Sequence, residues 1–154
     1  MRLFASRKEN ELDKKSWSFL RWFDIIIHGE LYLSRLTLLR TPWFSIKLHW
    51  IHKPDPDRDL HDHPWWFVSF VLSGGYREMT CADPTVHPQV ENTVRWFNMK
   101  NSREAHRISY VMPKTLTLVI TGGKKKSWGF YDNMGRFTDW KTYIRTKHGE
   151  AAQM

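Results

Sequence analysis

A chain of 154 residues with a formal net charge of +8 fits one domain, residues 1–154, that is long enough to bury a substantial core. The single cysteine, Cys81, excludes an internal disulfide and a thiolate zinc cluster, which suits a reducing compartment. No apolar segment has the length of a signal peptide core or a membrane span, so we expect a cytoplasmic protein with no membrane partner.

The first regular element that the sequence predicts is a short helix. Ser16 is a suitable N-cap, apolar residues follow at helical spacing over 17–27, and Gly29 is a stop signal. From residue 31 the pattern changes to alternation with a period of two, which indicates strands. The expected β segments are 31–39, 43–52, 60–73, 76–81, 93–99, 106–111, 115–121 and 127–131. Gly74-Gly75 has the composition of a two-residue hairpin turn that would need positive φ angles. Short strands at such steady spacing predict a sandwich or a barrel.

Aromatic residues make up 15% of the chain, with nine tryptophans and nine phenylalanines. Aromatic side chains are most often buried, so this content predicts a bulky aromatic interior or a ligand cleft with aromatic walls. The basic charge favours an anionic partner, such as a nucleotide or a phosphorylated metabolite. Nucleic acid remains an alternative partner by charge, although no nucleic-acid-binding motif is recognisable.

The strongest chemical signal is the segment Leu60-His61-Asp62-His63-Pro64. Residues at i and i+2 of a strand point to the same face, so His61 and His63 can approach one metal ion from one side. Imidazole is a good ligand for several divalent transition metals. The alternative is a pair of surface histidines beside an acidic loop.

The sequence HDHPWWFVSFVLSGGY resembles the first motif of the cupin superfamily, with His61 and His63 as the histidine pair and Gly74 as the turn glycine. Phe67 stands where that motif has its glutamate. His106 corresponds to the histidine of the second motif, whose other positions are degenerate here. The chain looks most like the small cupin-like, RmlC-like jelly-roll proteins common in phage and bacterial genomes.

The resemblance implies an all-β cupin fold, a double-stranded β-helix or jelly-roll barrel over about 31–145, with an N-terminal extension and short helix over about 1–29. It also implies a three-histidine metal site of His61, His63 and His106. Fe(II) is the favoured metal, with Mn, Ni or Zn as alternatives. If Glu78 pairs with Val71 across the glycine turn, it lies too far along the strand to ligate without strong curvature. The residues expected to contact a ligand or substrate are Tyr76, Glu78, Arg95, Arg103, Arg107 and Trp128.

These features predict a metal-dependent cupin enzyme that acts on a small anionic molecule, with an oxygenase, hence an oxidoreductase, as the first subclass. No catalytic residue can be assigned. An isomerase that uses a histidine as general base is a second enzymatic option. A non-catalytic module that sequesters a small ligand such as a nucleotide is the alternative of another class, which the missing glutamate favours. The oligomeric state is open, with a homodimer as one option.

Overall fold

The computed structural model describes residues 17–84 and 89–148, and these residues form two facing antiparallel sheets. The first sheet, here called sheet A, has the strand order β1-β2-β3-β10-β5-β8. Its strands are β1 (Ser18–Ile27), β2 (Glu30–Arg40), β3 (Phe44–Ile51), β10 (Thr115–Gly122), β5 (Phe67–Ser73) and β8 (Phe97–Lys100).

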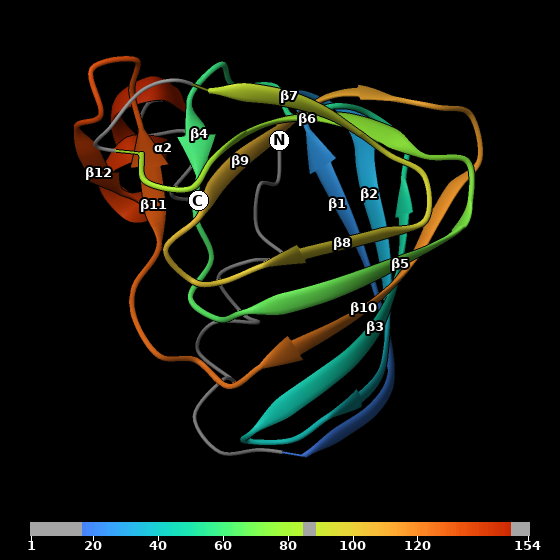
Figure 1. Ribbon diagram of the computed structural model, residues 1–154. Coiled ribbons are helices and arrows are strands. Elements are labelled where there is room, and N and C mark those ends of the chain that lie inside the picture. The colour runs from blue at the N-terminus through green and yellow to red at the C-terminus, as the bar shows by residue number, and fades with distance from the viewer. Residues whose placement is uncertain (1–16, 85–88, 149–154) are drawn as a thin grey trace.

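The second sheet, sheet B, has the order β12-β11-β4-β9-β6-β7. Its strands are β12 (Phe137–Asp139), β11 (Gly129–Tyr131), β4 (Leu60–His61), β9 (Ala105–Val111), β6 (Tyr76–Cys81) and β7 (Val90–Val94). One helix, α2 (Trp140–His148), follows β12 and packs beside β11 and β12 (Figure 1). These two facing sheets confirm the predicted all-β jelly-roll barrel. No helix among the described residues is long and apolar enough to cross a membrane.

The helix predicted over 17–27 is wrong, because Ser18–Ile27 is strand β1. Its residues pair with β2 along almost the whole strand, from Ser18 opposite Arg40 to Ile27 opposite Glu30. The run Ile25-Ile26-Ile27 favours a strand, because β-branched side chains suit the pleated surface. The proposed cap, Ser16, lies outside the described residues.

The hairpin predicted at Gly74-Gly75 is also wrong, although both glycines have positive φ angles of 69° and 153°. The strands that they join do not pair with each other: β5 pairs with β8 and β10, whereas β6 pairs with β7 and β9. The two glycines therefore carry the chain from sheet A to sheet B, which changes the predicted neighbours of every residue on β6.

The inner face of the barrel is divided between an apolar end and a polar end. The apolar cluster contains Leu33, Ile51, Tyr76 and Val94. A second apolar cluster, Leu60, Cys81 and Ala105, lies on the other face of sheet B, since the neighbours His61 and His106 point inward. The remaining interior is rich in buried polar side chains, among them Lys47, Ser69, Glu78, Asn98, His106 and Thr117. Aromatic residues supply only a small part of the buried interior: Phe67, Tyr76 and Tyr143 are buried, whereas none of the nine tryptophans, all of which lie in the described ranges, is.

Candidate metal centre

The three histidines singled out in the sequence meet at the polar end of the barrel. β4 is only two residues long and ends at His61, so His63 lies in the connection to β5, while His106 is the second residue of β9. The pairing of β4 with β9 places His61 directly opposite His106. The ring centroids of His61 and His63 are 5.1 Å apart, and those of His61 and His106 are 4.9 Å apart. Local strand geometry and long-range pairing therefore bring the three rings together.

The ligating atoms of this cluster are close enough to share one ion. One ring nitrogen from each of the three histidines lies within 4.8 Å of the other two, and Nε2 of His63 is 2.9 Å from Nε2 of His106. Two nitrogens that bind one ion at about 2.0–2.1 Å and at right angles are separated by about 3 Å. The donor set, three imidazoles with no acidic ligand, therefore fits a transition metal rather than Mg²⁺ or Ca²⁺.

A buried carboxylate, Glu78, bonds one outer nitrogen of this cluster, and a half-buried one, Asp55, lies near another. Glu78, 1% exposed, has Oε2 at 2.7 Å from Nδ1 of His106, and its Oε1 accepts a bond of 2.7 Å from the Lys100 ammonium. Asp55 lies with Oδ2 at 3.8 Å from Nδ1 of His61 and accepts bonds from the Tyr32 hydroxyl and the Ile108 amide. A carboxylate at the outer nitrogen directs the other nitrogen toward a metal.

Burial and neighbouring charge favour neutral imidazoles in this site. Burial is the main reason that the pKa of His61 falls to about 4, although Asp55 opposes the shift. The pKa of His63 lies well below its usual value because of burial and the nearby His61 and His106. Burial would raise the pKa of Glu78, but hydrogen bonds and charges from His106 and Lys100 outweigh it and lower that pKa. The site thus favours the neutral form of His61 and His63 and places an ionised carboxylate behind His106.

Phe67 occupies the position where a fourth ligand was missing from the sequence motif. Its ring packs edge-on against His63, with the ring centroids 5.0 Å apart. Phe67 is buried. The structure therefore offers no carboxylate at that position, and the acid nearest to taking its place, Glu78, stands behind His106 instead.

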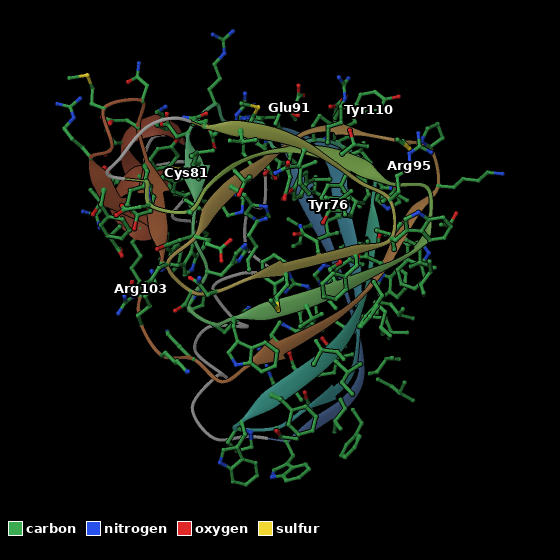
Figure 2. All side chains as sticks on the ribbon, in the orientation of Figure 1. Tyr76, Cys81, Glu91, Arg95, Arg103 and Tyr110 are labelled. Atoms are coloured by element: carbon green, nitrogen blue, oxygen red, sulfur yellow. The ribbon has the colours of Figure 1, made fainter. Side chains whose placement is uncertain are left out.

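The other predicted contact residues divide into two groups. Tyr76 and Glu78 are buried on the inner side of β6, and Trp128 lies beside His61 with ring centroids 6.4 Å apart. Arg95 and Arg103 are exposed and lie far apart in Figure 2, on either side of β8. Arg107 follows His106 on β9 and so points to the opposite face of sheet B. The three arginines therefore do not converge on the histidines.

Other basic groups, which sequence reasoning did not select, line the interior near the histidines. Lys47 is 2% exposed and has its ammonium 5.0 Å from the centre of the Trp65 ring. The Arg35 guanidinium donates a bond of 3.0 Å to Nε2 of His49, and the charge of Arg35 contributes to the lowered pKa of His63. The sequence did contain a signal for these interior groups. In the predicted strand 43–52, Ser45, Lys47 and His49 alternate with large apolar residues and so share one face.

No protein-family model and no curated protein sequence matches the chain, but solved structures do. Fe(II)-HppE with the alternative substrate (S)-1-HPP is 14% identical, over 68% of this chain and 55% of that one, with a TM-score of 0.50. Fe(II)-HppE with substrate is likewise 14% identical, over 67% and 56%, with a TM-score of 0.51. An RmlC-like cupin from Shewanella frigidimarina is 16% identical, over 73% and 96%, with a TM-score of 0.47.

The chain matches little more than half the length of HppE, and a similarity at these identities supports a common fold alone. Two facing antiparallel sheets that close around a histidine cluster are the arrangement expected from the first cupin motif. The chain therefore has a double-stranded β-helix barrel, the fold of the cupin superfamily.

Proposed function

We propose that His61, His63 and His106 hold one divalent transition metal and that the chain is a metal-dependent enzyme. The observation that carries this proposal is the convergence of the three imidazoles, from segments 43 residues apart, with ligating atoms within 4.8 Å of one another. Burial keeps His61 and His63 neutral, which metal binding requires. Three protein ligands leave coordination positions free for a substrate.

Fe(II) is the metal that we favour, with Mn(II), Ni(II) and Zn(II) as alternatives. Three imidazole nitrogens suit iron as well as the later metals, and the HppE structures that share the fold contain Fe(II) by their descriptions. Iron bound in this way would supply redox chemistry toward dioxygen and a substrate, so an oxygenase is the first activity to test. The chain's own contribution is to orient His106 through its contact with Glu78 and to place the charge of Asp55 near His61.

The substrate class that we propose is a small anionic molecule, bound inside the barrel. The support comes from the inner face of sheet A, where Lys47 lies between Thr37 and Val119 and Arg35 lies opposite His49. Both cations contribute to the lowered pKa of His49, after burial as the main cause. A carboxylate or phosphate group near the histidines would be attracted by these charges, because the local dielectric constant is low.

Metal content per chain tests the proposal. The parent is purified without a histidine tag, stripped, reconstituted separately with Fe(II), Mn(II), Ni(II) and Zn(II), and analysed by elemental mass spectrometry. We expect close to one metal ion per parent chain and almost none in His61→Ala, His63→Ala or His106→Ala. His52→Ala is the matched control, because that histidine is exposed and bonds Ser34 on the outside of sheet A. If the parent protein binds none of the four ions after reconstitution, the proposal is wrong.

A non-catalytic binding module is the second candidate, and Phe67 is the observation that favours it. The phenyl ring packs against His63 in place of a carboxylate and leaves the site without an acidic ligand. In that case the histidines and the interior cations would bind a ligand such as a nucleotide by hydrogen bonds and charge. Mass spectrometry of the untreated protein under native conditions distinguishes the candidates, because a sequestered ligand would copurify with metal-free chains.

A further inference from the structure

The outer face of sheet A carries two continuous apolar rows that cross all six strands. The first row, by paired neighbours from β1 to β8, is Trp22, Leu36, Leu48, Leu118, Phe70 and Phe97. The second row, in the same order, is Phe19, Leu39, Ile46, Ile120, Val68 and Met99. These twelve residues are here called the apolar face.

The apolar face is open to solvent in the described structure. Phe97 is 53% exposed, Met99 62%, Trp22 53% and Phe19 64%. Alternation places it on the outside, because the intervening residues Ser45, Lys47, Ser69 and Asn98 are buried in the barrel. Helix α2 does not cover it, since that helix packs on β11 and β12 of the other sheet (Figure 1).

The apolar face is also free of charge at its centre. Among the residues of β3, β5, β8 and β10, the only charged ones are Lys47 and Lys100, and both are buried in the barrel. The outer face of sheet B differs, because it presents Arg77 and Glu91, whose side chains lie 3.9 Å apart. The centre of the apolar face has no exposed cations that could bind an anionic partner such as nucleic acid. The apolar face is therefore suited to an apolar partner.

We propose that the apolar face binds the same face of a second copy of this chain, so that two barrels pack back to back through their A sheets. Two twisted sheets pack face to face at about 10 Å through interdigitated apolar side chains. A twofold interface brings the same patch from each copy together, and the uncharged centre of this face keeps like charges out of the contact between two chains of net charge +8.

The area of the apolar face agrees with a stable dimer. The exposed side chains of the two rows are flanked by Trp43, Phe44 and Leu72, which are 69%, 37% and 56% exposed. Eight side chains of this size, about half exposed, leave on the order of 800 Å² of apolar surface in water. Monomeric proteins seldom expose more than a few hundred Å² in one patch, and a standard interface buries about 800 Å² on each partner.

Sedimentation equilibrium of the full chain tests this proposal. We expect the parent to sediment at twice the 18.5 kDa chain mass at micromolar concentrations. Phe70→Glu and Phe97→Glu, tested separately, should each raise the dimer dissociation constant by at least roughly 100-fold, because a charge would be buried without a partner. Tyr110→Glu is the matched control: Tyr110 is 42% exposed on the outer side of sheet B, against 40% for Phe70. This variant should remain a dimer.

Circular dichroism of each variant establishes that the barrel is folded, and the use of two positions preserves the test if one variant fails to fold. A monomeric parent overturns the proposal and leaves the apolar face to residues 1–16 or to a different protein. A dimer that persists unchanged in both folded variants overturns it as well, because the contact must then lie elsewhere.

Discussion

At the scale of single residues, the histidine motif combines two side chains of the candidate metal site with one structural side chain, Asp62. His61 and His63 point into the barrel, whereas Asp62 between them is fully buried on the opposite side. Its carboxylate accepts a bond of 2.9 Å from the Gly129 amide and further bonds from Lys126 and the Tyr131 hydroxyl. The sequence predicted that His61 and His63 point the same way, but it placed both on one strand, whereas His63 lies in the connection after β4. It could not predict partners of Asp62 that lie more than 60 residues away, since only long-range pairing brings them near.

Replacing Asp62 by Asn should therefore destabilise the chain without removing a histidine. The change leaves Lys126 without its buried carboxylate, and we expect the free energy of unfolding to fall by about 1.5–3 kcal/mol. Urea denaturation followed by tryptophan fluorescence measures the loss. Asp132→Asn is the control, because that carboxylate serves only its own turn around Met134 and Arg136, so its loss should cost less. Equal stability of Asp62→Asn and the parent would contradict this role.

Glu78 is the residue whose position the sequence analysis misjudged most. The assumed hairpin put it opposite Val71, far from the histidines, whereas the observed register puts Thr80 opposite His106 and Glu78 opposite Ile108. Glu78 and Thr80 share the face of His106, so the carboxylate reaches Nδ1 of that ring. Which strands pair with β6 depends on the crossing of the chain from sheet A to sheet B, and the residues around Glu78 give no signal of that crossing.

Glu78→Gln should weaken metal binding while the three histidines stay in place. The neutral amide binds Nδ1 of His106 less strongly and loses the charge that pairs with Lys100. Loss of such a supporting carboxylate typically lowers metal affinity by about 10–100-fold. Competition with a chromophoric chelator measures the affinity, and Glu91→Gln on the exposed strand β7 should leave it unchanged. Unaltered affinity in a folded Glu78→Gln variant would exclude the positioning role.

At the scale of elements, alternation located most strands of the barrel to within a few residues. The segment 76–81 is strand β6 as predicted, and 43–52 contains β3. The predicted strand 93–99 is instead β7 and β8 joined by a turn, because Val94 and Phe97 belong to different sheets. The helical spacing over 17–27 was misleading, since this segment pairs with β2 at the edge of sheet A, with one shift of register between Ile25 and Ile26, and spacing alone cannot reveal that pairing.

The crossover glycines provide a test at this scale. Gly74 and Gly29 both have positive φ, 69° and 79°, but a Cβ at Gly74 would lie 2.5 Å from Oγ1 of Thr115, whereas Gly29 has nothing within 4 Å. Gly29→Ala should cost only the backbone strain, about 1 kcal/mol. Gly74→Ala adds a clash with buried Thr115 and should cost several kcal/mol by thermal or urea unfolding. Similar losses in the two variants would show that the close approach to β10 does not matter.

At the scale of the whole molecule, the sequence does not reveal which face of each strand turns inward. In β3, either Phe44, Ile46 and Leu48 or Ser45 and Lys47 could face the interior, and the usual burial of apolar residues favours the first set. The structure has the second set inside, because the buried polar groups satisfy one another. Ser45 bonds Thr121 at 2.7 Å, and Asn98 bonds both Tyr76 and Glu78. Such a network arises only when both sheets are assembled.

The enclosed hydroxyls of the tyrosines make the whole fold sensitive to high pH. Burial is the first cause of a raised pKa at Tyr32, Tyr76, Tyr131 and Tyr143, and it brings Tyr131, with Asp62 beside it, to about 12. Unfolded tyrosines ionise near pH 10, so above that pH the unfolded chain releases protons that the folded chain retains. The free energy of unfolding should therefore be unaffected by these groups below about pH 10 and fall as the pH rises through about 12.

Absorbance at 295 nm during an alkaline titration measures this effect directly. In the native protein, the absorbance change of these four tyrosines should appear at higher pH than in the same chain unfolded in guanidinium, and it should coincide with loss of the circular dichroism signal. Tyr131→Phe removes one of the retained protons, so denaturant unfolding of this variant should depend less steeply on pH between about 10 and 12 than that of the parent. If native and unfolded chains titrate together near pH 10 while the barrel remains folded, the tyrosines are not enclosed as described.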